Sequence, residues 1–272
     1  MERVYAKKQY GQNFLKDSSI LNKIIQSMPQ NSNHIVEIGP GLGDLTKYLV
    51  KYKDVTAYEV DTDLIGVLKS KFANELNSSK LSLIHSDVLK VWETSSSLYG
   101  SKYDLIANLP YYIATNIILK AFEDKLCEHI IVMVQKEVAE KFTARAKEKE
   151  YSSLSIITES ISLDSKILFD VPPEAFEPIP RVVSSILYIK KDLLKSFDRG
   201  FNSFLKICFM QPRKKLSKNL LSILDKEQIS SIYSDFKVDE NIRPHELNSS
   251  LYSQIYTKVK NGRDKRTSTT EC

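Results

Sequence analysis

The sequence predicts an α/β fold: a doubly wound, mostly parallel sheet with an antiparallel edge hairpin, followed by a small all-α C-terminal domain. Up to Val134, short apolar runs alternate with helix-like stretches. Two later apolar runs are separated only by a proline-rich connection, and no strand-like run follows Asp192. Strands that alternate with helices are typical of parallel sheets, and right-handed crossovers order the first three strands as half of a doubly wound sheet.

Five strands are predicted in the first half of the chain. They cover residues 34–40, 55–60, 81–87, 103–109 and 129–134. The stretches between them have apolar residues at helical spacing, which predicts helices over 44–52, 63–76 and 115–126. A helix that runs into a charged connection is expected over 135–150, and another helix over 154–161.

The edge hairpin is predicted from residues 166–171 and 182–190. Residues 172–181 join them and include Pro172, Pro173, Pro178 and Pro180. This connection is too short for a crossover helix, so the two strands should be antiparallel.

Four amphipathic stretches separated by polar turns make up the rest of the chain, which predicts a helical domain. They cover residues 196–210, 215–224, 226–236 and 245–260. We therefore expect a ligand-binding domain over 1–192, a helical domain over 193–260 and a disordered polar tail over 261–272.

The composition fits a cytoplasmic protein, and its mildly basic charge allows an anionic partner without requiring one. The chain has 272 residues, a net charge of +5 and a sequence pI of about 8.8. Its basic residues include a run without acids, at Arg213, Lys214, Lys215 and Lys218. The three cysteines form no CxxC pair, so neither a metal site nor a disulfide framework is expected. No apolar window of about 18 residues predicts a membrane span.

A glycine turn follows the first predicted strand, in the stretch "EIGPGLGDLT". Gly39, Gly41 and Gly43 would let a ligand approach the backbone closely, and we assign Gly39 and Gly41 to ligand binding. Asp44 stands where the dinucleotide fingerprint requires another glycine. A nucleotide-dependent oxidoreductase, which would bind a pyrophosphate here, is therefore the weaker interpretation.

Glu59 and Asp87 come at the carboxyl ends of the next two predicted strands. Each acid alone would more commonly cap a helix or close a turn. Together they point to one crevice, where Glu59 could accept hydrogen bonds from ribose hydroxyls and Asp87 from an adenine amine. The sequence has no Walker lysine, so a neutral or cationic adenosine ligand such as S-adenosylmethionine fits better than a phosphate.

The stretch "NLPYYI" ends the fourth predicted strand, at the expected switch point. A turn is the simpler interpretation, but the residues also suit methyl transfer to an adenine amine. The Asn108 oxygen and a carbonyl of Leu109 or Pro110 could accept both amine hydrogens and free the nitrogen lone pair. Tyr111 could stack on a flipped-out base. Phe176, on the proline-rich connection, could cover its other face, and Tyr112 is expected in the core.

Several motifs together resemble the ribosomal RNA adenine dimethyltransferases of the KsgA/RsmA type. They are "GQNFL" (11–15), "EIGPGLGDLT" (37–46), "YEVD" (58–61), "SDVLK" (86–90), "NLPYYI" (108–113), "QKEVAEKF" (135–142), "VPPEAFEPIPRVVSS" (171–185) and "IRPHEL" (242–247). The resemblance implies a Rossmann-like class I S-adenosylmethionine-dependent methyltransferase sheet. It also implies dimethylation of two adjacent adenosines in a hairpin loop near the 3′ end of 16S rRNA, during ribosome biogenesis.

The same resemblance implies roles for individual residues. Asn13 and Leu15 would join Gly39, Glu59, Asp87 and Asn108 in the methyl-donor pocket. Arg213, Lys214, Lys215 and Lys218 would bind rRNA phosphates. Departures at Ser152 and Pro212 put local RNA contacts in doubt.

Two alternative functions are also compatible with these motifs. Related enzymes methylate an adenine of 23S rRNA and confer macrolide-type resistance, and a non-catalytic assembly factor would also bind rRNA. The expected partner is small-subunit rRNA or a pre-30S particle, with no obligate protein partner implied.

Overall fold

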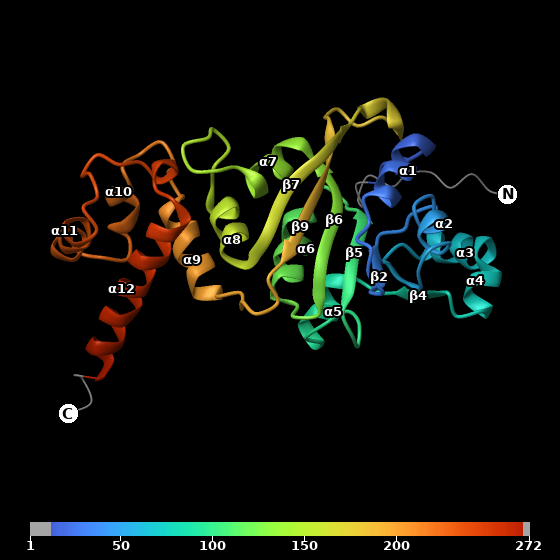
Figure 1. The fold of residues 1–272 in the computed structure, drawn as a ribbon, viewed down its shortest axis with the longest axis horizontal. Coiled ribbons are helices and arrows are strands. Elements are labelled where there is room, and N and C mark those ends of the chain that lie inside the picture. The colour runs from blue at the N-terminus through green and yellow to red at the C-terminus, as the bar shows by residue number, and fades with distance from the viewer. Residues whose placement is uncertain (1–11, 269–272) are drawn as a thin grey trace. The chain divides into compact units, whose positions relative to one another are not determined.

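The computed structural model describes residues 12–268 (Figure 1), so Gly11 of the first motif and residues 269–272 of the predicted tail lie outside the described residues. Internal contacts divide the chain into two compact units. The first unit ends at Ala139 and resumes over Ile161–Ser196, and the second takes Glu140–Ser160 and the chain from Phe197 onward. Residues 140–160 thus group with the helical unit rather than with the first predicted domain.

A seven-stranded sheet with the order β4-β3-β2-β5-β6-β9-β7 forms the first unit (Figure 1). Its strands are β2 (His34–Ile38), β3 (Val55–Glu59), β4 (Leu81–His85), β5 (Tyr103–Asn108), β6 (Cys127–Gln135), β7 (Ser162–Val171) and β9 (Ser184–Lys191). The first five are parallel, whereas β9 pairs antiparallel with both β6 and β7. The predicted doubly wound half and antiparallel edge hairpin are confirmed.

Most helices of this unit lie where the apolar spacing predicts them, whereas the helices over 18–26 and 88–94 were not predicted. They are α1 (Ser18–Gln26), α2 (Thr46–Leu49), α3 (Thr62–Lys71), α4 (Ala73–Asn77), α5 (Val88–Thr94) and α6 (Ala114–Glu123). Two more, α7 (Lys136–Thr143) and α8 (Ser153–Ile161), span the boundaries between the units. The helix predicted over 63–76 is interrupted at Phe72, whose buried ring separates α3 from α4.

Carboxylates at the strand ends also begin the helices that follow. Asp17, Asp61 and Asp87 are the N-cap residues of α1, α3 and α5, and each accepts a hydrogen bond from a backbone N–H of the first turn. Such caps satisfy N–H groups that have no partner within the helix. Because Asp87 starts α5, β4 ends at His85, two residues earlier than the predicted strand.

A two-stranded antiparallel sheet was not predicted. It pairs β1 (Phe14–Leu15) with β8 (Phe176–Glu177), which follows the 3-10 helix η2 (Pro173–Ala175). Strands of two residues carry no periodic pattern in the sequence. The pairing joins the start of the described chain to the connection between β7 and β9.

The second unit is helical. It contains α9 (Arg199–Cys208), α10 (Leu216–Leu220), α11 (Lys226–Asp235), the 3-10 helix η3 (Pro244–Glu246) and α12 (Ser249–Ser268). Its core includes Leu205, Cys208, Leu216, Leu220, Tyr252 and Ile255, all of which are fully buried. The helix α12 continues into the segment predicted as a disordered tail.

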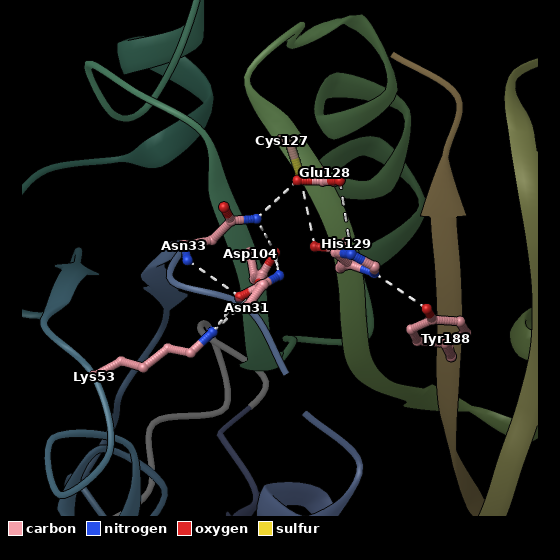
Figure 2. A network of polar contacts seen from close by, with 8 residues as sticks. All are labelled: Asn31, Asn33, Lys53, Asp104, Cys127, Glu128, His129 and Tyr188. Atoms are coloured by element: carbon pink, nitrogen blue, oxygen red, sulfur yellow. Dashed lines mark hydrogen bonds and ion pairs between the residues drawn. The ribbon is translucent and has the colours of Figure 1, made fainter. Parts of the chain in front are cut away.

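A network of polar contacts connects the amino ends of the central strands β5 and β6 (Figure 2). The Asp104 carboxylate on β5 is fully buried, and Asn33 donates to it at 2.9 Å and to Glu128 on β6 at 2.9 Å. Lys53 forms an ion pair with Asp104 at 3.4 Å. His129 on β6 hydrogen-bonds to the Tyr188 hydroxyl on β9 at 3.1 Å. The network therefore connects the segment before β2 to the middle of the sheet.

Removing the central carboxylate should destabilise the first unit. Asp104→Ala would leave Lys53 and Asn33 without their buried acceptor, and breaking a buried pair of this kind costs about 3–5 kcal/mol. We expect the free energy of unfolding, measured with denaturant, to fall by that order. Glu93→Ala, which removes an exposed acid from α5, is the control. Equal losses in the two variants would contradict the role of the network.

Candidate functional site

A cavity of about 280 Å³ opens at the carboxyl ends of the parallel strands in the first unit. Residues 12–15, 37–42, 58–60, 86–89 and 108–113 contribute most of its lining. The parallel register brings the ends of β2, β3 and β5 to this edge. The lining includes every residue predicted for the methyl-donor pocket, namely Asn13, Leu15, Gly39, Gly41, Glu59, Asp87 and Asn108. Their individual roles stay predictions.

The glycine turn has a backbone that other residues would strain. Gly39, Gly41 and Gly43 have φ angles of 68°, 61° and 75°, a region that L side chains rarely adopt. A Cβ atom on Gly43 would lie 2.4 Å from the Phe72 ring, and one on Gly41 would lie 3.1 Å from the Phe14 ring. Close packing and backbone conformation therefore both require glycine here.

Glu59 holds this turn against the end of β3. Its carboxylate accepts hydrogen bonds from the backbone N–H groups of Gly41 at 3.1 Å, Val60 at 2.9 Å and Asp61 at 2.9 Å. Burial raises the pKa of Glu59, while these backbone donors act in the opposite direction. The carboxylate is thus fixed beside the glycine turn and faces the cavity.

Two further buried acids lie near Glu59, and neither was predicted to bind the ligand. Glu37 is fully buried on β2 and accepts a hydrogen bond from the Thr46 hydroxyl at 2.6 Å. Burial, more than the nearby Glu59 and Asp44 charges, raises the pKa of Glu37 to about 8. Asp61 is also buried and accepts a hydrogen bond from the Gln12 side chain at 3.0 Å. In the sequence, the only indication of a role for Asp61 was its position in the motif "YEVD".

Asn108 lies at the last position of β5, as the sequence predicts. Its side-chain nitrogen donates to the backbone carbonyl of Asn13 at 3.0 Å. The amide therefore has a defined orientation in which its oxygen, an acceptor, is the other polar atom. The backbone N–H of Leu109 donates to the Met133 carbonyl at 3.2 Å, which holds the start of the turn against β6.

The two tyrosines of "NLPYYI" have different surroundings. The Tyr111 hydroxyl and the buried Ser184 hydroxyl on β9 are 2.6 Å apart, and burial raises the pKa of Tyr111. This hydrogen bond fixes the ring at the cavity. Tyr112 was expected in the core, and that prediction is wrong, because the side chain is 61% exposed at the cavity rim.

Phe176 is placed differently from the prediction. It is 3% exposed and belongs to the same apolar cluster as Leu15, with which it pairs across β1 and β8. It does not belong to the cavity lining. The predicted sandwich of a base between Phe176 and Tyr111 is therefore not formed in this arrangement, because the β1–β8 pairing holds residue 176 in the core.

The basic segment lies in the second unit, where Arg213, Lys214 and Lys215 come between α9 and α10 and Lys218 lies within α10. Arg213, Lys214, Lys215 and Lys218 are all exposed. The buried Asn219 organises the turn before them, because its side chain donates to the carbonyls of Cys208 and Gln211 and accepts from the Gln211 N–H. The side chains are thus presented to solvent on a fixed backbone, and their binding of RNA stays a prediction.

Within residues 12–268, no group of three His, Cys, Asp or Glu side chains is arranged to hold a metal ion. None of the helices in that range is both long and apolar enough to cross a bilayer.

Comparison with known families supplies the identification. The model of the ribosomal RNA adenine dimethylase family matches residues 3–261. This chain belongs to that family. It is 74% identical to the "Ribosomal RNA small subunit methyltransferase A" of Aliarcobacter butzleri, over 97% of this chain and 100% of that protein. It is 51% identical to the protein of the same name from Sulfurimonas denitrificans, over the full length of both.

Solved structures show that the dimethylase chain has the expected class I methyltransferase fold. A dimethyladenosine transferase from Plasmodium falciparum aligns with a TM-score of 0.76 at 23% identity, over 91% of this chain and 97% of that one. The 23S rRNA methyltransferase ErmE aligns with a TM-score of 0.66 at 21% identity, over 91% of this chain and all of that one. At these identities the likeness concerns the fold alone.

The raised pKa of Glu37 predicts how the stability of this dimethylase depends on pH. Its pKa is about 8 in the folded chain against an ordinary 4.5, so between these values the folded state binds more protons than the unfolded state. The free energy of unfolding should therefore fall as the pH rises through this range. Glu37→Gln should lessen that fall in denaturant titrations, and parallel pH curves would contradict the assignment.

Proposed function

We propose that the chain uses S-adenosylmethionine to dimethylate two adjacent adenosines in a hairpin loop near the 3′ end of 16S rRNA, during ribosome biogenesis. Membership of the adenine dimethylase family and the small-subunit name of its full-length relatives support this. The observation that carries it is the Asn108 amide, held at an acid-lined cavity with its nitrogen already bonded to Asn13.

The cavity lining suits a cationic adenosine compound. Four acidic side chains, those of Glu37, Asp44, Glu59 and Asp87, line it, and among residues 12–268 no Lys or Arg does. Such a lining disfavours a pyrophosphate, as the dinucleotide of an oxidoreductase would require, and favours a positive charge. S-adenosylmethionine, when bound, supplies a methyl group on a positively charged sulfur. Glu59 would accept hydrogen bonds from its ribose hydroxyls, and Asp87 from its adenine amine.

The "NLPYYI" turn would make the amine of the target adenine more nucleophilic. An adenine amine is a poor nucleophile because its lone pair is delocalised into the ring. The Asn108 oxygen and a carbonyl of Leu109 or Pro110 would accept its two hydrogens, which favours a pyramidal nitrogen with an available lone pair. Pro110 has no N–H that could compete for these acceptors. Tyr111, whose hydroxyl is bonded to Ser184, would stack on the unpaired base.

Small-subunit rRNA is the preferred substrate over 23S rRNA. Relatives with 43% to 74% identity, covering nearly the whole chain, carry the small-subunit name. The likeness to ErmE concerns the fold only. A pre-30S particle in the cytoplasm would present the hairpin loop, and the exposed basic segment would contact its phosphates.

The role of Asn108 is tested by Asn108→Ala. Without its acceptor the target amine is no longer oriented, so we expect methylation of small-subunit rRNA to fall by about 100-fold or more. rRNA binding should be largely kept. The measurements are mass spectrometry of dimethyladenosine in the rRNA and a binding titration. Asn74→Ala removes an exposed amide from α4 and is the control. Binding that collapsed together with activity would refute the catalytic role.

The role of the basic segment is tested by salt. If Lys214 and Lys215 contact phosphates, the double alanine variant should lower the slope of log affinity against log salt by about 1 per lost contact. The control is Lys69→Ala with Lys80→Ala, which removes two exposed charges from the other unit. An unchanged slope in the Lys214 and Lys215 variant would place the RNA elsewhere.

A further inference from the structure

The described chain begins with a segment that touches both halves of the candidate site. We call residues 12–17 the N-terminal strap. On the donor side, Gln12 donates to Asp61, and the Phe14 ring lies against Gly41 of the glycine turn. On the substrate side, the Asn13 carbonyl accepts the hydrogen bond from Asn108. The strap therefore has one contact that acts directly on the proposed catalytic amide.

This contact decides which atom Asn108 can offer to the substrate. The oxygen and the nitrogen of a carboxamide occupy similar positions, and only hydrogen bonding distinguishes the two orientations. The Asn13 carbonyl is an acceptor, so it selects the orientation in which the nitrogen points towards the strap. If the strap moved away, the amide could turn and present N–H groups to the substrate amine, which needs an acceptor.

The strap is attached to the sheet by few backbone bonds. The β1–β8 ladder has two residue pairs, extended by one hydrogen bond from the Lys16 N–H to the Ala175 carbonyl at 2.8 Å. Short two-stranded ribbons are marginal by themselves. The position of the Asn13 carbonyl therefore depends on side-chain contacts as well.

An ion pair adds such a contact at the end of the strap. The Lys16 ammonium lies 2.6 Å from the Asp44 carboxylate on the glycine turn, with side chains 40% and 29% exposed. Lys71 holds the same carboxylate from the other side at 3.8 Å and donates to the Leu42 carbonyl at 2.6 Å. Asp44 is thus fixed on the turn, and Lys16 connects the strap to it.

We propose that Lys16 and Asp44 are positioning residues for methyl transfer. Their ion pair holds the strap in the register at which the Asn13 carbonyl keeps the Asn108 oxygen available to the target amine. Neither residue needs to touch the reacting atoms, since both act through Asn108. The inference rests on the proposed function. It also assigns a role to Asp44, which occupies the position where the dinucleotide fingerprint has a glycine.

A purely structural role would have a different signature. Asn13, Phe14 and Leu15 line the cavity, so a loosened strap also weakens the wall around the donor. If the ion pair only closed that wall, its loss would raise the KM for S-adenosylmethionine and leave kcat unchanged. Positioning of Asn108 requires that kcat fall even when donor and rRNA are saturating.

The kinetic test uses charge reversal and a conservative replacement. We expect Lys16→Glu to lower kcat by about tenfold, because it replaces an attraction by a repulsion, and Lys16→Arg, which keeps the charge, to retain most of the native kcat. Lys47→Glu makes the same charge change at an exposed position of α2 and should leave kcat near the native value. An effect of Lys16→Glu on KM alone, or an equal loss of kcat in Lys16→Arg, would overturn the proposal.

A second readout requires no catalysis. In the native chain without donor or rRNA, the Asn108 side-chain N–H₂ signals in an NMR spectrum should show slow exchange with solvent, because one N–H is bonded to Asn13. Lys16→Glu should speed that exchange, and Lys16→Arg should leave it near the native rate. Unchanged exchange in Lys16→Glu would overturn the positioning role. A native chain that failed to methylate rRNA would instead refute the proposed function.

Discussion

The polar groups of the cavity lie together because β2, β3 and β5 are parallel and end at one edge of the sheet. Residues far apart in the chain, such as Gly39, Glu59 and Asn108, thereby reach the same small volume. Their convergence has an electrostatic cost. Burial raises the pKa of both Glu37 and Glu59, so the pocket gathers acids that are poorly solvated. A cationic ligand would relieve that cost, which is one physical reason to expect a sulfonium compound there.

The same edge brings the glycine turn and Asn108 against one short segment. The N-terminal strap contacts the glycine turn through Phe14 and the Asn108 amide through Asn13. This segment therefore touches both sides of the cavity. Methyl transfer needs the amine and the methyl group to be aligned. A segment that lines both sides of the cavity would keep the two bound groups in a fixed relative position.

The arrangement of the sheet was predictable because local patterns decide it. Buried parallel strands are continuous apolar runs, and crossover handedness limits their order. The assignment of residues 140–160 to the helical unit was not predictable, since periodicity shows that a segment is helical and not which core it joins. The break at Phe72 and the two-residue strands β1 and β8 likewise depend on packing with distant residues.

That the glycines, the acids and Asn108 come to one cavity could be predicted from local patterns, because each lies at the end of its own strand. The orientation of the Asn108 amide, the burial of Phe176 and the exposure of Tyr112 could not be predicted in this way. Each of these depends on what lies opposite in space. The Asn13 carbonyl, which orients Asn108, is 95 positions away from it in the chain. Leu15, which pairs with Phe176, is even further from its partner, and no local pattern encodes contacts over such separations.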